Sequence, residues 1–213
     1  MIRNSLVAAL SLSVSIILSG CGSNPSRAQL FMEETAPVKN VPELGQNKLE
    51  YDKAVKYTFS EKSDVSKFET GKSYAVLFAL PEFKDSSTVE IKSYCDCFGF
   101  AKHVFIPIAI LLDEGFNKTG EIKFVTHSQT MWEPVHFVSE ATLDKKDRYV
   151  LIYSDPNRYG KPADRVYADA VHVRTDQLDR KTVMKTYSNA KEGVWWEGAA
   201  TGEIQVLVKS PGK

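Results

Sequence analysis

Residues 88–94 read TVEIKSY, an alternation of apolar and polar side chains with a period of two. Successive side chains of an extended strand point to opposite faces of the sheet, so Val89, Ile91 and Ser93 share one face. Glu90, Lys92 and Tyr94 then lie on the other face. A strand that covers a core with one face and meets water with the other is typical of an antiparallel sheet.

Further short strands are predicted on both sides of this stretch, separated by turn residues. They cover residues 55–59, 72–80, 104–112, 121–125, 135–138, 148–154 and 204–208. Many short strands punctuated by turns predict a mainly β fold, an antiparallel β-sandwich with jelly-roll-like character. The stretch 104–112 is continuously apolar, which predicts a strand buried on both faces, and Pro107 within it predicts an edge position or a bulge.

One segment near the C-terminus has a different pattern. Asp176 is a candidate helix cap, and Leu178, Val183, Met184 and Tyr187 recur at rough helical spacing. Residues 176–190 therefore predict one short helical or irregular excursion before the last strand.

The N-terminus has the composition of a secretory signal. Arg3 is followed by an apolar run with interspersed serines, which is shorter than the about 20 apolar residues of a membrane span. Residues 18–21 read LSGC and match the lipobox, the cleavage motif of bacterial lipoproteins. Residues 1–20 are therefore predicted to be a lipoprotein signal peptide, cut before Cys21, whose thiol accepts lipid.

The resemblance to bacterial lipoproteins implies three acyl chains on the mature Cys21. More than one chain is needed for a stable anchor, because each buried methylene contributes only about 0.8 kcal/mol. Gly22 and Ser23 follow the cysteine, where an aspartate would resemble an inner-membrane retention signal. The sequence therefore favours a lipid anchor in the outer membrane, facing the periplasm.

Residues 21–50 are predicted to be the lipidated N-terminus and a flexible tether, with a short helix near residues 27–34. The segment is rich in serine, proline and glycine, and its few apolar residues predict no core of its own. Residues 51–213 are then the β-sandwich domain.

The charge of the chain is balanced, with 27 basic and 27 acidic residues. Removal of the signal peptide takes away Arg3 alone, which leaves 26 basic and 27 acidic residues and a net charge of −1. Without a basic field the chain is not expected to attract nucleic acid or anionic lipid. Membrane association is therefore predicted to rest on lipid rather than on charge.

Two cysteines remain besides Cys21, spaced as Cys95-Asp96-Cys97. An oxidising compartment permits a disulfide between them. In a regular strand their Cα atoms would be about 6.6 Å apart, near the upper limit for a disulfide, so the bond would need a local bend. A disulfide, two thiols that are free or differently paired, and a metal site all stay open.

The sequence contains no motif of a familiar enzyme. It has no nucleophile elbow, no glycine-rich phosphate loop and no paired-histidine zinc motif. The histidines are His103, His127, His136 and His172, which are predicted to be surface or strand-end residues. We therefore predict no enzymatic activity, no catalytic residue, no cofactor and no metal.

Aromatic residues are the candidate ligand-binding groups. Trp132, Tyr159, Trp195 and Trp196 lie beside turn residues or carboxylates, and an aromatic ring can stack on the apolar face of a sugar. Adjacent tryptophans in a strand point to opposite faces, so one of Trp195 and Trp196 is expected to be exposed. The alternative is that all the tryptophans cover the sandwich.

The order of the segments resembles the maltose-operon periplasmic protein family (MalM). Residues 73–76 precede the alternating strand at 87–94, an apolar strand ends at residues 110–113, and residues 148–154 and 201–208 complete the pattern. The resemblance covers roughly residues 70–208, and it implies an exported protein linked to maltodextrin uptake, with no assigned enzymatic mechanism. The lipobox and the Cys95-Asp96-Cys97 sequence depart from the family pattern, and no functional residue transfers.

Two functions from different classes follow. The first is a periplasmic accessory or binding lipoprotein with a carbohydrate ligand, and a concave pocket containing Trp195 or Trp196 with nearby acids would favour it. The second is a structural or assembly lipoprotein that binds another envelope protein, and a flat apolar patch would favour it. A hydrolase is a weaker third hypothesis, which a buried carboxylate pair about 5 to 9 Å apart would revive.

Overall fold

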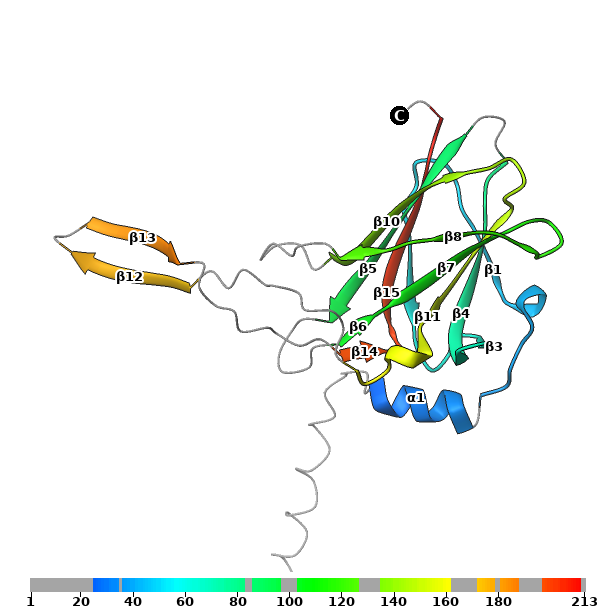
Figure 1. Cartoon of the computed structure of the whole chain (residues 1–213), viewed down its shortest axis with the longest axis horizontal. Helices are drawn as coiled ribbons and strands as arrows, with labels where there is room; N and C mark the ends of the chain where they lie inside the picture. The colour runs from blue at the N-terminus through cyan, green and yellow to red at the C-terminus, as the bar shows by residue number, and fades with distance from the viewer. Residues whose placement is uncertain are drawn as a thin grey trace, which may run out of the picture.

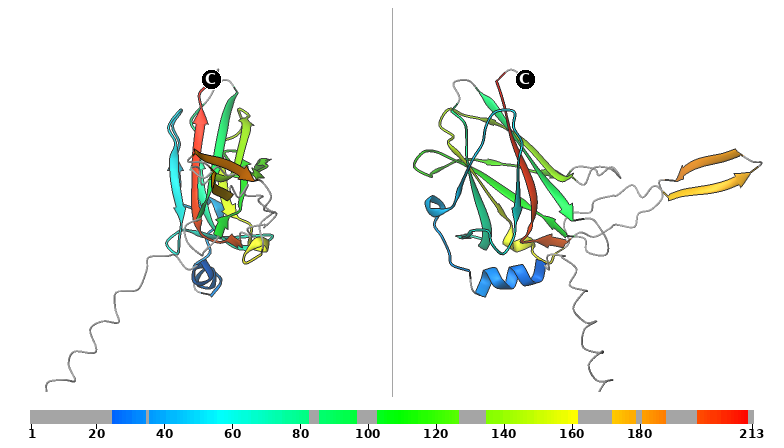
Figure 2. Two further views of the ribbon diagram at one scale, coloured as in Figure 1. Left: turned by 90° about the vertical axis from the view of Figure 1, so that its left-hand side faces the viewer. Right: turned by 180° about the vertical axis from the view of Figure 1, so that it is seen from behind.

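The computed structural model shows two β-sheets packed face to face (Figure 1). It describes residues 25–34, 36–82, 86–96, 103–126, 135–161, 172–178, 181–187 and 197–211. The view along the edge of the sheets shows the two layers side by side (Figure 2). The predicted mainly β sandwich is therefore confirmed.

The first sheet, called sheet 1, has the order β1-β4-β11-β7-β8, and β3 also pairs with β4. Its strands are β1 (Gln46–Lys48), β3 (Val65–Phe68), β4 (Gly71–Ala79), β7 (Pro107–Leu112), β8 (Lys118–Ile122) and β11 (Tyr149–Ser154). All pairs are antiparallel except β1 with β4, which is parallel.

The second sheet, called sheet 2, is built around β5, which pairs with β10 and β15 along its length and with β6 at its end. Strand β2 pairs with β15, β9 with β10, and β14 with β6 in parallel. Its strands are β2 (Val55–Phe59), β5 (Ser87–Asp96), β6 (His103–Phe105), β9 (Val125–Thr126), β10 (Val135–Leu143), β14 (Glu197–Ala199) and β15 (Gly202–Lys209).

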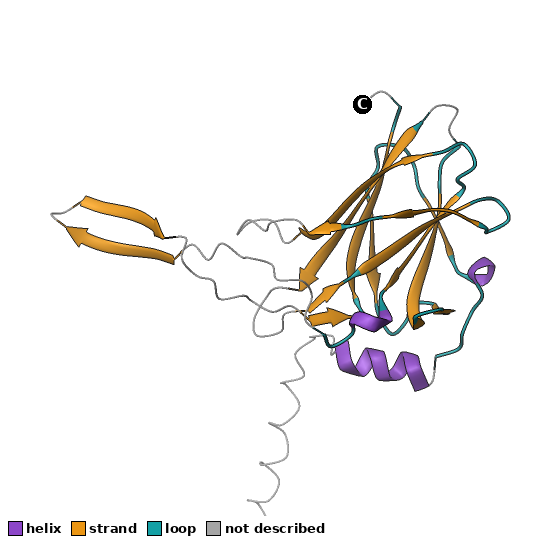
Figure 3. Ribbon diagram, in the orientation of Figure 1, coloured by secondary structure: helices purple, strands orange, loops and turns teal. Residues whose placement is uncertain are grey.

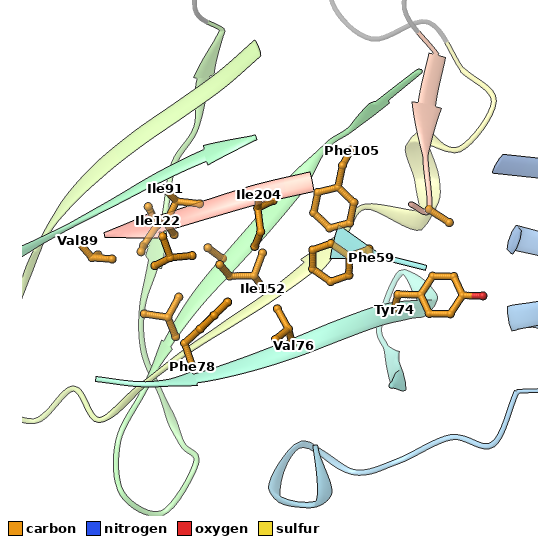
Figure 4. Close-up of a cluster of buried hydrophobic side chains, with 14 of the residues drawn as sticks. Phe59, Tyr74, Val76, Phe78, Val89, Ile91, Phe105, Ile122, Ile152 and Ile204 are labelled. Atoms are coloured by element: carbon orange, nitrogen blue, oxygen red, sulfur yellow. The ribbon is translucent and has the colours of Figure 1, made fainter. Parts of the chain in front are cut away.

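The core lies between the two sheets (Figure 4). The predicted inner face of β5 is confirmed, because Val89, Ile91 and Ser93 are fully buried while Glu90 and Lys92 are partly exposed. The rings of Phe59 on β2 and Phe105 on β6 stack with their centroids 4.1 Å apart.

The apolar stretch 104–112 is two strands rather than one. The chain passes from β6 in sheet 2 to β7 in sheet 1 at Ile106, and Pro107 begins β7 opposite Ser154. A proline at the first residue of a strand gives up no ladder hydrogen bond in the strand interior. Ile108 and Ile110 of β7 are only half-buried, so the prediction of a strand buried on both faces is wrong at these positions. The apolar run is long because the chain passes from one sheet to the other within it.

The helix predicted within residues 176–190 is wrong. Strand β12 (His172–Leu178) and strand β13 (Lys181–Tyr187) pair with each other as an antiparallel two-stranded sheet. The segment is rich in β-branched residues, which favour strands, and this preference outweighs the irregular helical spacing.

Described residues that precede the predicted domain start at residue 51 are packed against the sandwich. The predicted short helix is present as α1 (Pro25–Glu34), which lies against one end of the sandwich (Figure 3). Ala28 and Met32, spaced i and i+4 on one helix face, are buried, and Tyr74 Oη donates a 2.9 Å hydrogen bond to the carbonyl of Ala28. Residues 1–24, including the predicted signal peptide and Cys21, lie outside the described part.

Residues 36–48, called the strap, continue from α1 along the outer face of sheet 1. They include the 3-10 helix η1 (Val41–Glu43) and strand β1. Leu44 of the strap is buried in a second apolar cluster with Leu77 and Leu151, outside the main core. The apolar residues of this segment therefore complete a core supplied mainly by other parts of the chain.

Candidate functional site

A cavity of about 370 Å³ lies where the chain passes from sheet 2 to sheet 1. Its volume is within the range of small-molecule sites, toward the lower end. It is lined by Ile106, Pro107, Ile108, Glu121, Ile122, Lys123, Phe124, Phe137, Asp155 and Arg158.

Apolar side chains form one part of the cavity wall. Ile106, Phe124 and Phe137 belong to a small cluster that also contains Cys95 and Val104 at the end of sheet 2. Ser139 Oγ donates a 2.6 Å hydrogen bond to the carbonyl of Lys123, which joins β10 of sheet 2 to the chain that leaves β8 of sheet 1. The aromatic wall is thus held by contacts between the two sheets.

The charged part of the wall comes from β8 and from the 3-10 helix η2 (Pro156–Arg158). Asp155 caps η2 by accepting a 3.0 Å hydrogen bond from the backbone N–H of Asn157. The N–H of Asp155 donates to the carbonyl of Ile106 at 3.1 Å, so η2 is held against the point where the chain changes sheet. Asp155 and Arg158 are therefore positioned by the backbone that forms the cavity.

The formal charges around the cavity cancel, since Glu121 and Asp155 are balanced by Lys123 and Arg158. The carboxylates accept hydrogen bonds and the cations donate them. Glu121 is already paired with Lys118, at 2.7 Å, and its side chain is 53% exposed. This arrangement suits a neutral ligand that both donates and accepts hydrogen bonds.

Strand β14 lies directly behind the cavity, and a glycine makes this approach possible. A Cβ added to Gly198 would be 2.3 Å from the carbonyl oxygen of Arg158 and 2.9 Å from Cδ1 of Ile106. The backbone of Gly198 exchanges hydrogen bonds with Gly160 at 2.9 Å and with Lys161 at 3.0 Å. Any side chain at position 198 would therefore displace a cavity wall.

Tyr159, a predicted ligand-binding residue, is buried in the main core, so the prediction is corrected. Its hydroxyl lies 3.0 Å from Ser73 Oγ, which also accepts a hydrogen bond from the N–H of Ser154. Burial raises the pKa of Tyr159 to about 12, although the hydrogen bonds with Ser73 and Ser154 act in the opposite direction. A ring enclosed in this way has no face on which a sugar can stack.

The other predicted ligand-binding residues, Trp132, Trp195 and Trp196, lie outside the described residues. The described ends of their segments can be placed. Thr126 pairs with Phe137 of the cavity wall, and Glu197, which follows Trp196 in the chain, pairs with His103 on β6. Both segments that carry tryptophans thus join the fold beside the cavity.

Cys95 is disulfide-bonded and is buried at the end of β5. Its predicted partner, Cys97, lies outside the described residues, so the pairing itself stays a prediction.

No group of three or more histidine, cysteine or acidic residues within the described part of the chain could hold a metal ion. His103 is half-buried at the start of β6, while His136 and His172 lie on strands whose side chains at these positions are not described. Within the same described ranges, no helix is long and apolar enough to cross a membrane.

The cavity-lining charges were not predicted from sequence. Glu121 and Lys123 flank Ile122, Asp155 precedes η2 and Arg158 is its last residue, but no local motif connects these two segments. They meet because β11, which precedes η2, pairs with β7, which in turn pairs with β8.

A comparison of the chain with protein-family models, curated proteins and solved structures finds no match in any of the three. The resemblance to the maltose-operon periplasmic protein family is therefore untested and stays a prediction.

Proposed function

We propose that this protein is a lipoprotein anchored in the outer membrane through Cys21, facing the periplasm, and that its β-sandwich is a non-enzymatic binding module. The LSGC motif at residues 18–21, preceded by an apolar segment, supports the anchor. The cavity between the two sheets is the observation that supports a binding role.

The lining of the cavity favours a neutral ligand rich in hydroxyl groups, of which a short carbohydrate is the proposed class. Phe124, which is half-buried, offers apolar surface for a sugar ring, and the balanced charges offer donors and acceptors for its hydroxyls. Trp132, Trp195 and Trp196 stay proposed stacking residues. The resemblance to the maltose-operon family makes maltodextrins the first ligands to test.

The binding proposal is tested by titrating the mature chain with maltodextrins while its tryptophan fluorescence is recorded. We expect a saturable shift that is lost in Trp195→Ala or Trp196→Ala. Glu121→Gln and Lys123→Gln are expected to weaken binding by about tenfold each, since each loses a hydrogen bond to a charged group. Glu114→Gln, an exposed change in the turn after β7, is the control and leaves binding unchanged.

The absence of any shift with maltodextrins and other envelope glycans would remove the carbohydrate role. The anchor has a separate test, which is mass spectrometry of Cys21 and membrane fractionation of the Cys21→Ser variant. Retention of that variant in the membrane would contradict the lipid anchor.

The geometry does not favour a hydrolase. Glu121 and Asp155, the two carboxylates of the cavity, are exposed and partly exposed. The acid of a glycosidase usually lies in an apolar pocket, and neither of these carboxylates is buried.

The alternative function is a structural or assembly lipoprotein that binds another envelope protein. Its support is a set of half-buried apolar residues on the outer face of sheet 1, where Ile108 and Ile110 lie near the stacked rings of Phe116 and Tyr149, 4.9 Å apart. Cross-linking from Ile108 in intact envelopes tests it, with a cross-linker at Lys56 on the outer face of sheet 2 as the control. A partner captured equally from both positions would contradict this surface.

A further inference from the structure

The side of α1 that faces away from the sandwich carries two large exposed apolar residues together with the charged residues Arg27 and Glu34. Leu30 is 55% exposed and Phe31 is 41% exposed, whereas Ala28 and Met32 on the opposite side are buried. Among the described residues four large apolar side chains are exposed, and three of them, Leu30, Phe31 and Val38, lie within nine consecutive positions. Single exposed apolar residues are ordinary, but this concentration marks one surface.

We propose that the outward face of α1, formed by Leu30 and Phe31, rests on the bilayer that holds the lipidated Cys21. This inference depends on the proposed lipid anchor and adds to it a membrane-contact surface and a fixed orientation of the domain.

The length of the connection supports a bilayer as the occupant of this surface. Pro25, the first residue of α1, follows Cys21 by four residues, which span at most about 14 Å when fully extended. The acyl chains hold Cys21 at the membrane surface. A helix of ten residues is itself about 15 Å long, so its outward face lies within reach of the headgroups.

The helix is attached firmly to the domain, so the contact would orient the whole sandwich. Met32 is fully buried, and Lys72 Nζ donates a 2.9 Å hydrogen bond to the carbonyl of Glu33 at the C-terminal end of α1. Tyr74, which points toward α1 in Figure 4, binds the carbonyl of Ala28. The end of the sandwich that carries α1 would face the bilayer, and β14, which contacts both α1 and η2, would bring the cavity close to it.

The charges on α1 indicate that the contact is apolar rather than ionic. Arg27 is paired with Glu61 at 3.7 Å, and Glu33 and Glu34 are exposed in the last turn. With no excess of basic residues on the helix, anionic lipid is not required. The contact is therefore expected in vesicles of neutral phosphatidylcholine alone.

The test places a photo-crosslinking amino acid at position 30 of the full mature lipidated chain, reconstituted in phosphatidylcholine vesicles. The control position is Lys145, in the exposed turn between β10 and β11. This turn lies at the other end of the sandwich, because Tyr149 pairs with Ala79 at the end of β4 remote from Tyr74. We expect phospholipid adducts at position 30 to exceed those at position 145 by about tenfold.

A second pair of variants tests the apolar side chain itself. Phe31→Ser is expected to reduce the lipid adducts at position 30, whereas Val125→Ser removes an even more exposed apolar group from β9 and is expected to leave them unchanged. Circular dichroism checks that each variant is folded.

The outcomes separate this inference from the anchor. Equal lipid adducts at positions 30 and 145 in a chain with acylated Cys21 would overturn the membrane contact and leave the anchor standing. Adducts to protein in place of lipid would overturn it as well. A chain whose Cys21 carries no lipid would overturn both proposals.

Discussion

The outer faces of the two sheets differ in kind. On sheet 1, Ala75, Leu77 and Leu151 point away from the main core yet are buried, because the strap covers them. On sheet 2, Glu90 and Lys92 occupy the equivalent outer positions of β5 and stay partly exposed. The outer face of sheet 1 is therefore covered at β4 and β11, whereas the outer face of sheet 2 at β5 meets solvent.

The difference shows how one chain uses two kinds of strand. Strands β4 and β11 of sheet 1 have long runs of buried residues, whereas β15 of sheet 2 alternates buried and half-buried residues. A strand buried on both faces needs no alternation, and it needs a covering layer. In this protein the strap supplies that layer, so the N-terminal segment is part of the fold.

The largest effect on the free energy of unfolding is expected for Leu77→Ala, which is compared with the same substitution at a second leucine. Leu77→Ala removes a fully buried side chain beneath the strap and is expected to lower the free energy of unfolding by about 2–5 kcal/mol. Leu207→Ala makes the same change on the half-buried outer face of β15, and less than about 1.5 kcal/mol is expected. Urea unfolding measures both. Equal losses would show that the strap does not make the outer face of sheet 1 a core.

The next largest effect on stability is expected at Asp64, which binds two positions of the strap. Its carboxylate accepts a hydrogen bond from Lys39 Nζ at 2.6 Å and one from the N–H of Gly45 at 2.9 Å. Asp64→Asn is expected to cost about 1–2 kcal/mol of unfolding free energy, since hydrogen bonds to a charged group are lost. Glu50→Gln, whose ion pair with Lys53 is exposed on both sides, is the control with no measurable change.

The contribution of Asp64 to the free energy of unfolding should also depend on pH. Burial alone would raise the pKa of Asp64, but the hydrogen bonds from Lys39 and Gly45 outweigh it and hold the pKa below the usual 3.8. A depressed pKa in the folded state means that the stabilisation is complete above the unfolded pKa and is lost as the pH falls through the folded one. The difference between the wild type and Asp64→Asn is therefore expected at pH 7 and should shrink below about pH 4. A difference independent of pH would contradict a role for the charge.

The strands of this fold could be predicted from local pattern, but their layering could not. The alternation at 88–94 predicts β5 and its inner face, because the apolar and polar residues of a half-buried strand alternate along its own sequence. Residues 25–50 carry few apolar side chains, and their burial depends on partners such as Tyr74 and Leu77 far along the chain. Local composition therefore predicts a tether. The uninterrupted apolar runs of β4 and β11 do indicate that both faces of these strands are buried, and hence that another segment covers the outer face.

The candidate site was harder to predict for the same reason. Aromatic residues can be selected by type, and Tyr159 was selected in this way although its ring is buried and its hydroxyl is bound to Ser73. The charged residues around the cavity, such as Glu121 and Arg158, have ordinary neighbours in sequence. Only the pairing of the strands brings them together around one cavity. A cavity formed where a chain changes sheet has no local sequence signature.

The smallest effect is expected on the outer face of sheet 2. Glu90 lies between Lys92 at 3.2 Å and Lys209 at 3.1 Å, and Lys209 also binds Glu140 at 2.6 Å. Burial alone would raise the pKa of Glu90, but the hydrogen bonds from Lys209 and Lys92 lower it. These partners remain accessible to water and salt, so Glu90→Gln is expected to cost less than about 1 kcal/mol.

High salt distinguishes this network from the strap. In 1 M salt, where the screening length is about 3 Å, the Glu90→Gln effect on urea unfolding should diminish. The effect of Leu77→Ala should persist, because apolar burial is not screened. Glu203→Gln, which breaks the more exposed pair with Lys56, is the control and should change nothing measurable. A Glu90→Gln loss as large as that of Leu77→Ala and insensitive to salt would mean that the outer face of sheet 2 is also a core, and the contrast between the two sheets would fail.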